Sequence, residues 1–254
     1  MLLKEIVEYL DDFLDVKNIQ DSCKNGLEVE GKEEVTKIGF AVDACMESFR
    51  KAAKAKCDLL MVHHGLFWGD MGYLRGILYK KISMLVKHGI ALYAAHLPLD
   101  IHPDVGNNVQ LAKKLDLTVK KTFCEYKGHD IGVVCENDTD FNDLLQRAQK
   151  ELPTTYLNFT DTAERIGIIT GSGGMGIEDA VKNGCDTFVT GEIDHPEYRA
   201  VEEYGINLIC GGHYNTETVG PRALMNHIQE KFGIDCEFLH LTGMESKMLR
   251  GEGI

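Results

Sequence analysis

The sequence predicts an α/β fold. Eight apolar runs rich in β-branched residues recur along the 254 residues, from VTKIGFAVDA at 35–44 to CEFLHL at 236–241. Helical patterns separate several of them, as in LYKKISMLVKH at 78–88 and FNDLLQRAQK at 141–150. Strands that alternate with amphipathic helices are typical of sheets with helical crossovers. A 44% hydrophobic content is enough to fill one or two globular cores.

The elements can be placed in chain order. The first segment, MLLKEIVEYLDDFL, carries acids every few residues between apolar positions and predicts an amphipathic helix rather than a signal peptide. Between the first and last strands named above, strands are expected in six further runs: CDLLMVHHG, GIALYAAHL, DIGVVCE, RIGIITG, CDTFVTGE and INLICGGH. In the segment NTETVGPRALM, Gly220 and Pro221 indicate a helix start.

The two halves of the chain repeat one order of elements. KIGFAVDAC at 37–45 precedes a helix and then KCDLLMVHH, and RIGIITGSG at 165–173 precedes a helix and then GCDTFVTGE. Nineteen residues separate Ile38 from Cys57, and nineteen separate Ile166 from Cys185. After each unit comes a further helix and an apolar strand that ends in histidine, GIALYAAH in the first half and GINLICGGH in the second. Two similar βαβ halves, the second with a shorter crossover, explain this repetition, although units of this kind resemble one another in any case. We expect two related α/β domains with mixed sheets and crossover helices.

The domain boundary is expected between Lys120 and Asp130, where KKTFCEYKGHD interrupts the pattern. This predicts an N-terminal domain at 1–124 and a C-terminal domain at 125–254, with a functional site at their interface. The C-terminal segment could also pack back on the first domain. No stretch resembles a flexible linker.

Composition limits the classes of function. No window holds eighteen uncharged apolar residues, so a soluble, cytoplasmic protein without membrane contact is expected. The formal net charge of −13 disfavours general binding of a nucleic-acid backbone. The run KKLDLTVKK is either a local basic patch or a solvated helix end. The eight cysteines include no CxxC and lie mostly in apolar runs, which favours reduced, buried thiols over disulfides or zinc ligands.

Histidines and carboxylates gather where the predicted strands end. In α/β sheets, functional groups collect beyond the carboxyl ends of strands, because loops converge there. The candidates that follow strands are His63, His64, His96, Asp100, Glu192, Asp194, His195, His213 and Glu217. Three of the imidazoles and two of the carboxylates, namely His63, His64, His213, Asp100 and Glu217, are suitable donors for Zn²⁺, Fe²⁺ or Mn²⁺. Five donors suit two ions better than one, since a carboxylate can bridge them.

Each candidate has an alternative interpretation. Adjacent histidines in a regular strand point to opposite faces, so His63 and His64 converge only if the strand breaks, which Gly65 would permit. His96 is expected within its strand, as a proton carrier or as a group that orients a ligand. His195 is either a proton carrier or a helix-start residue. A structural or surface role is expected for the other histidines: His88, His102, His129, His227 and His240.

A competing pattern is GSGGMG at 171–176, a GxGxxG between a strand and the helix IEDAVKNG. In a dinucleotide fold an acid would end the next strand, and Glu192 could fill that role. This interpretation leaves the histidines unexplained. A tight turn whose amides face a phosphate or carboxylate is the simpler alternative.

Five motifs in order resemble the GTP cyclohydrolase I type 2 homologue family, also called the Nif-three-like dimetal proteins. They are VHHGLFW, AHLPLD followed by GNN, GSGG, TGEIDH and GGHYNTE, and they cover nearly the whole chain. The chain departs from the family at Gly65, where proline usually follows the two histidines.

The resemblance implies a Nif-three-like fold of two related domains that assembles as a toroidal homohexamer with dinuclear metal sites. It implies two divalent ions per chain, Zn, Fe or Mn, held by His63, His64, Asp100, His213 and a bridging Glu217. The five donors at strand ends lead us to expect metal-dependent hydrolysis, with His96 or His195 as the catalytic proton carrier. The resemblance suggests a purine nucleotide as the substrate. A non-catalytic hexamer that binds metal or serves as an interaction platform, with or without nucleic acid, is the alternative.

Overall fold

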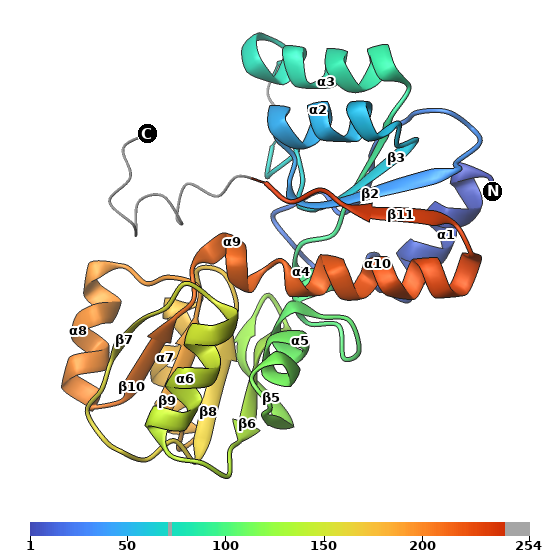
Figure 1. Cartoon of the computed structure of the whole chain (residues 1–254). Coiled ribbons are helices and arrows are strands. Elements are labelled where there is room, and N and C mark those ends of the chain that lie inside the picture. Colours follow the sequence, from blue (N-terminus) through green and yellow to red (C-terminus); the bar gives the residue numbers. More distant parts are fainter. Residues whose placement is uncertain (71–72, 242–254) are drawn as a thin grey trace. The chain divides into compact units, whose positions relative to one another are not determined.

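The computed structural model describes residues 1–70 and 73–241. These residues form two compact units. The first unit joins Met1–Val105 to the described residues from Gly220 onward, and the second is the continuous segment Gly106–Val219. Both units combine a mixed sheet with helices, so the α/β prediction is confirmed (Figure 1).

The first unit contains a five-stranded sheet in the order β1-β4-β3-β2-β11. The pairs β2·β3, β3·β4 and β11·β2 are parallel, and β1 is an antiparallel edge strand. Its strands are β1 (Gly26–Val29), β2 (Lys37–Asp43), β3 (Leu59–His64), β4 (Ala91–Ala94) and β11 (Asp235–Phe238). Its helices are α1 (Leu3–Phe13), α2 (Met46–Ala55), α3 (Gly76–His88), α4 (Leu97–Asp100) and α10 (Val219–Phe232).

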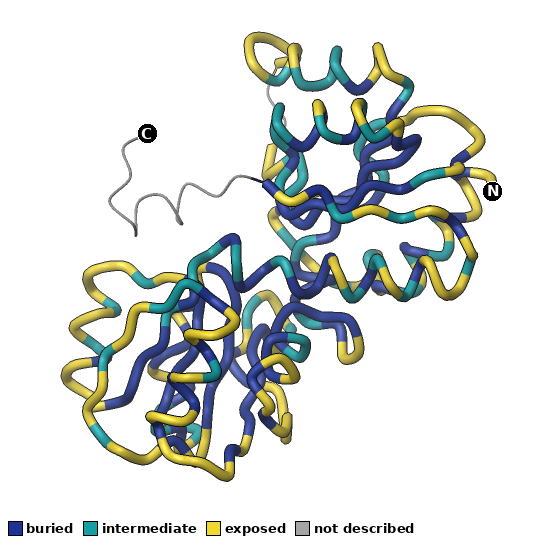
Figure 2. The backbone as a smooth tube through the Cα atoms, viewed as in Figure 1, coloured by how far each residue is buried: buried dark blue, intermediate teal, exposed yellow. Residues whose placement is uncertain are grey.

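Helices cover both faces of this sheet, because successive strand residues point to opposite sides. Leu59 and Met61 of β3 pack in a cluster with residues of α1 and α10, whereas Leu60 and Val62 pack in another with residues of α2 and α3. Figure 1 shows α2 and α3 on one side of the sheet and α1 and α10 on the other. Figure 2 shows the strands between these helices as largely buried. Lys56, whose backbone is in the left-handed conformation, ends α2.

The second unit contains a six-stranded sheet in the order β5-β6-β8-β9-β10-β7. The pairs β8·β9 and β9·β10 are parallel, and the others are antiparallel. Its strands are β5 (Thr118–Tyr126), β6 (His129–Glu136), β7 (Thr155–Leu157), β8 (Arg165–Ile169), β9 (Thr187–Thr190) and β10 (Asn207–Cys210). Its helices are α5 (Asn107–Lys114), α6 (Phe141–Glu151), the 3₁₀ turn η1 (Gly174–Gly176), α7 (Ile177–Lys182), α8 (His195–Tyr204) and α9 (His213–Thr216).

The repetition seen in the sequence corresponds to repeated strand pairing. Ile38 pairs with Leu59 and Ile166 pairs with Thr187, so the partner lies 21 residues further on in both units. The next crossover differs, because Leu59 pairs with Ala91 whereas Thr187 pairs with Asn207. The second crossover of the second unit is therefore the shorter one, as the sequence predicts.

The units divide the chain differently from the expected boundary at 124/125. The segment KKTFCEYKGHD forms the ends of β5 and β6 and the turn between them, where Lys127 and Gly128 have positive φ. An antiparallel hairpin disturbs a βαβ rhythm but belongs to one sheet, so no boundary falls there. The chain instead changes unit near Val105 and again near Gly220. The described part of the C-terminal segment belongs to the first unit, and residues 242–254 lie outside the described residues.

All eight cysteines are free thiols, as the composition predicts. Burial raises the pKa of several of them, for example that of Cys57 to about 11 and that of Cys135 to about 12. These thiols are therefore protonated near neutral pH. Among the described residues, no helix combines the length and apolar character needed to cross a membrane.

Candidate metal centre

Three histidines of the first unit come together beyond the carboxyl ends of β3 and β4. His63 and His64 are the last two residues of β3, and His96 precedes α4. Their ring centroids are 4.6 Å apart for His63 and His64, and 5.1 Å and 5.7 Å from these to His96. One ring nitrogen from each lies within 4.8 Å of the others, so the three side chains form a cluster that could hold a metal ion.

Each ring of this cluster is oriented by an oxygen atom at its Nδ1 atom. His63 Nδ1 lies 2.9 Å from the carbonyl oxygen of Ala95. His64 Nδ1 lies 2.8 Å from Asp43 at the end of β2. His96 Nδ1 lies 3.0 Å from Asp21, whose side chain is only 2% exposed.

Asp21 belongs to the loop before β1 and also accepts the Leu97 amide. Burial of its carboxylate opposes ionisation, but the hydrogen bond and charge of His96 outweigh this and lower the pKa of Asp21. The carboxylate is therefore ionised and holds the His96 ring at neutral pH.

Asp100, the last residue of α4, places a carboxylate beside His63 in the same unit. It is 9% exposed, and its Oδ1 atom lies 3.5 Å from Nε2 of the fully buried His63. Pro98 within the first turn of α4 favours this short helix directly after the strand.

In the second unit, His213 and Glu217 form a pair at the two ends of α9. Nε2 of His213 lies 3.2 Å from Glu217 Oε2, and Nδ1 lies 2.8 Å from Glu192 Oε1. Glu217 is 3% exposed. Its hydrogen bond with His213 is the main cause that raises the pKa of this histidine to about 10. A cation that binds Nε2 would have to displace that proton, so metal uptake is coupled to proton release.

Glycine makes room for the Glu217 carboxylate. Gly171 follows β8 with φ +66°, and a Cβ atom there would lie 2.0 Å from Glu217 Oε1 and 3.4 Å from His213 Nε2. A side chain at this position would therefore displace the Glu217 carboxylate. The glycine after β8 positions the acid, a role that the GxGxxG interpretation does not include.

The residues fit a divalent cation in their hydrogen-bond chemistry. The Nδ1 partners of all four histidines are carbonyl or carboxylate oxygens, which only accept, so Nδ1 carries a proton and Nε2 is the ring atom that can bind a cation when it is unprotonated. An oxygen acceptor behind the bound imidazole is the usual arrangement in protein metal sites. Two atoms bound to one tetrahedral ion at about 2.0–2.1 Å lie roughly 3.3–3.4 Å apart, close to the Nε2–carboxylate separations of 3.2 and 3.5 Å.

β3 ends at His64, directly before Gly65, and the rings of His63 and His64 meet there, as expected for a strand that stops at this glycine. Two local expectations are corrected. His96 lies after β4 rather than within it. Asp100 and His213 lie on short helices, and Glu217 is the residue that caps one of them.

The remaining catalytic candidate, His195, is the first residue of α8 and is exposed. In the described part of the chain, no cluster of three metal-capable side chains includes it. This position agrees with the helix-start interpretation.

Three amides of the glycine loop donate to groups within the second unit. The Gly171 amide donates to Thr216, the Gly173 amide to Thr190 and the Gly176 amide to the Gly173 carbonyl. The Glu197 carboxylate lies against Gly174, where a Cβ atom would be 2.1 Å from it. An acid at this place repels a phosphate, so the loop is a turn and does not form the expected anion site. Glu192, the acid that a dinucleotide fold would need, orients His213 instead.

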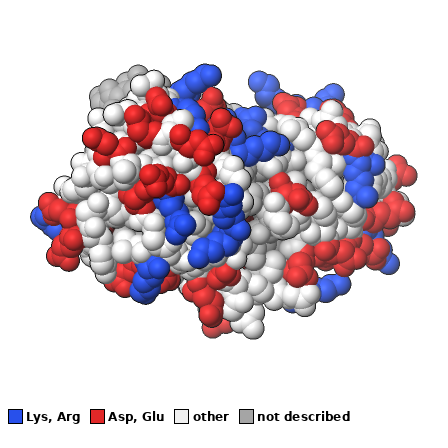
Figure 3. All heavy atoms as spheres, turned by 90° about the horizontal axis from the view of Figure 1, so that it is seen from below, with Lys and Arg blue, Asp and Glu red and all other residues white. Residues whose placement is uncertain are grey.

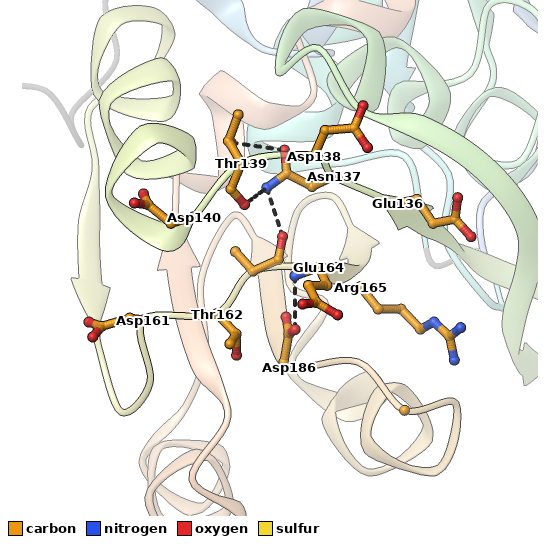
Figure 4. Close-up of a pocket in the computed structure, with 12 residues that line it drawn as sticks. Glu136, Asn137, Asp138, Thr139, Asp140, Asp161, Thr162, Glu164, Arg165 and Asp186 are labelled. Atoms are coloured by element: carbon orange, nitrogen blue, oxygen red, sulfur yellow. Dashed lines mark hydrogen bonds between the residues drawn. The ribbon is translucent and has the colours of Figure 1, made fainter.

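In the second unit, a cavity of about 810 Å³ lies near the amino ends of β8 and β9, whereas His213 follows the carboxyl end of the parallel strand β10. Figure 4 shows acidic side chains around it, with Asp186 beside Glu164 and the guanidinium of Arg165 directed away from them. The cavity lies at the carboxyl end of β6 and the amino ends of β8 and β9, so it is separate from the histidines within this unit. On the face shown in Figure 3, acidic and basic side chains alternate, and they do not form a continuous basic surface.

The sequence does not identify the side chains that orient the rings, namely Asp43, Asp21 and Glu192. Asp43 ends β2 next to β3, so the same rule that selected the histidines could have selected it. The sequence marks Glu192 as a candidate at a strand end and as the acid of a dinucleotide fold, but not as the partner of His213. Asp21 lies in an irregular loop between α1 and β1, and no periodic pattern in the sequence marks it.

Comparison with known proteins agrees with this fold. The model of the family Duf34/NIF3 (NGG1p interacting factor 3) matches residues 1–244. A protein of Pyrococcus horikoshii named GTP cyclohydrolase 1 type 2 homolog is 45% identical over 241 residues, which are 92% of this chain and 96% of that protein. One of the same name from Archaeoglobus fulgidus is 43% identical over 244 residues, covering 95% and 98% of the two chains.

Solved structures agree as well. A protein of Thermus thermophilus superimposes with a TM-score of 0.86 at 39% identity, covering 96% of this chain and all of that one. The protein ybgI, described as of unknown function, has a TM-score of 0.89 at 30% identity, covering 96% and 99%. With the family model matching almost the whole sequence, the chain belongs to the Duf34/NIF3 (NGG1p interacting factor 3) family.

Proposed function

We propose that the chain binds two divalent metal ions through His63, His64, Asp100, His213 and Glu217. The observation that carries this proposal is the anchoring of every Nδ1 atom by an oxygen, which leaves Nε2 as the ligand atom. The first unit supplies three of the donors and the second unit supplies two. Zn²⁺, Fe²⁺ and Mn²⁺ all accept such a set of imidazole and carboxylate donors.

The activity that this donor set supports best is metal-dependent hydrolysis, with a purine nucleotide as the substrate class. Bound ions would supply Lewis-acid activation of water and of the substrate carbon. The chain's own residues fix the geometry: Asp43 orients His64 and Glu192 orients His213. His96, held at Nδ1 by the buried Asp21, is the proton carrier of the proposal. The name shared by the relatives above suggests GTP as the first substrate to try.

Metal content of the purified full chain tests the binding step. After expression with Mn²⁺, Fe²⁺ or Zn²⁺, elemental analysis should give two ions per chain, and an anomalous-scattering map should locate them. His64→Ala should lose at least one ion. His88→Ala is the matched control, because His88 is exposed at the end of α3. A wild-type protein with well under one ion per chain would refute the proposal.

A second candidate is a metal-binding protein without turnover. It is favoured by the glycine loop, where the Gly171 and Gly173 amides already donate within the unit and the Glu197 carboxylate beside Gly174 repels a phosphate. Metal-loaded protein should be assayed with GTP, other nucleotides and oligonucleotides. Turnover that His96→Ala reduces while metal content is kept supports the enzyme, and a metal-replete chain inert to the whole panel supports the second candidate.

The assembly proposed with either function is a homohexamer. Light scattering coupled to gel filtration should then give six times the 28.4 kDa of one chain. A monomeric mass at micromolar concentration would contradict the hexamer without affecting the metal proposal.

A further inference from the structure

The only tryptophan of the chain, Trp68, lies beside the histidine cluster of the first unit. It stands four residues after His64, in the loop that follows β3, and is 41% exposed. A single exposed aromatic residue is ordinary on a protein surface. The surroundings of Trp68 are what distinguish it.

The indole ring contacts two of the candidate metal-site histidines. Its centroid lies 4.9 Å from that of His96 at an interplanar angle of 69°, an edge-on arrangement. The His64 ring centroid is 6.2 Å away. The ring therefore borders the cluster on one side and is open to solvent over part of its surface.

Hydrogen bonds hold the loop that carries this ring. The indole Nε1 atom donates to the Gly65 carbonyl over 2.9 Å. The amides of Leu66 and Phe67 donate to the carboxylate of Glu28, on the edge strand β1, over 2.8 and 3.0 Å.

The loop is also tied to the segment before β1. The Lys24 amide donates to the Phe67 carbonyl and the Gly69 amide to the Ser22 carbonyl, both over 2.8 Å. Cys23 and Trp68 form an antiparallel bridge. Ordering a loop costs conformational entropy, and here the cost is met before any ligand arrives.

We infer that Trp68 is a stacking platform for a planar heteroaromatic ring of the ligand that reaches the histidine cluster. A fixed, partly exposed indole offers a π face to any flat ring, whereas a saturated ligand gains little from it. The inference rests on the proposed function, because it places the ring next to the imidazoles that would hold the metal. It adds that ligand selection depends on the flat ring, a nucleobase or a similar heterocycle.

The test uses the metal-loaded full chain with guanosine and adenosine as planar probes and ribose 5-phosphate as the non-aromatic probe. Because Trp68 is the sole tryptophan, its fluorescence reports directly on this position. A planar probe should quench it saturably, with the same dissociation constant that calorimetry gives. Ribose 5-phosphate should leave it unchanged.

Variants separate stacking from general structure. Trp68→Leu should weaken binding of the planar probe about tenfold or more, and Trp68→Phe should restore most of it. Tyr204→Leu is the matched control, since Tyr204 is 50% exposed at the end of α8 and precedes the amino end of β10, whereas His213 follows its carboxyl end. The control should bind the probe like the wild type.

Two results would overturn the inference. One is saturable binding of a planar probe that leaves wild-type Trp68 fluorescence unchanged, a readout that needs no variant to fold. The other is failure of both planar probes to bind protein that has taken up Mn²⁺. Mn²⁺ uptake is measured separately by elemental analysis, so a chain that takes up no metal refutes the proposed function and is distinguished from a failure of the stacking platform.

Discussion

Each histidine of the candidate centre is fixed at its Nδ1 atom, so the direction of its lone pair depends on one oxygen acceptor. For His64 that acceptor is Asp43, and for His213 it is Glu192. Acceptors of this kind set the tautomer, orient the ring and raise its basicity. The proposed ligands could be selected from the sequence because they follow strand ends, whereas Asp21 could not, since it lies in an irregular loop.

Asp43→Ala should therefore lower metal affinity about 10- to 100-fold, although no proposed ligand is removed. Competition with a chelator of known affinity measures the change. Asp12→Ala, which removes an exposed carboxylate on α1, should bind metal like the wild type. Equal affinity in both variants would show that the Asp43–His64 contact does not prepare the site.

Glu28 predicts a pH dependence of stability. Burial raises the pKa of Glu28 from 4.5 to about 7, although the Leu66 and Phe67 amides act in the other direction. The folded state then binds the proton more tightly than the unfolded state, so the Glu28 contribution to the unfolding free energy falls as pH rises from about 4.5 to 7.

Glu28→Gln should remove this part of the pH dependence. Urea denaturation of both proteins between about pH 4.5 and 7 measures their free energies of unfolding. As pH rises, the variant should become progressively more stable relative to the wild type. Glu30→Gln, at an exposed position of the same segment, is the control. Parallel curves for wild type and Glu28→Gln would contradict the assigned pKa direction.

At the level of elements, the turn after β3 is shaped by an acid on the edge strand β1, two strands away in the sheet. A Cβ atom on Gly65 would lie 2.3 Å from Glu28 Oε1 and 2.7 Å from Ala94 Cβ. Glycine is thus the residue that lets the Glu28 carboxylate reach the two loop amides. Periodicity in the sequence placed the predicted strands correctly, including β3, because apolar runs are local signals. It did not reveal this turn, because Glu28 and Gly65 are 37 positions apart.

Gly65→Ala should destabilise the protein by about 1–3 kcal/mol, since the added methyl group overpacks the turn. Glu28→Ala in the same chain should recover part of this loss, because the closer of the two contacts is then removed. A double-mutant cycle measured by chemical denaturation gives the coupling between the two positions. Additive effects would show that the turn adjusts without moving Glu28.

At the level of the whole molecule, two compact units are built from one chain. The second unit is continuous, whereas the first takes α10 and β11 from beyond it. The sequence indicated two related α/β halves, and the pairing offsets agree. It could not show that the chain returns to the first unit near Gly220, because the parallel pairing of β11 with β2 joins residues almost 200 positions apart.

Separate cores predict local responses to core mutations. Leu224 of α10 and Leu144 of α6 are both fully buried, each in the core of a different unit. Replacing either by alanine should cost about 2–5 kcal/mol. Hydrogen exchange should show faster opening of β2 and β3 in Leu224→Ala, and of β8 and β9 in Leu144→Ala. Equal acceleration of all four strands in both variants would mean that the two units open as one.

The discontinuity of the first unit also has a consequence for biosynthesis. Chains leave the ribosome from the amino terminus, and domains fold as they emerge. Residues 106–219 can complete their structure while the last helix and edge strand are still being translated. The portion made first is thus finished last, and until then the apolar surface that α10 will cover stays open to chaperones or to aggregation.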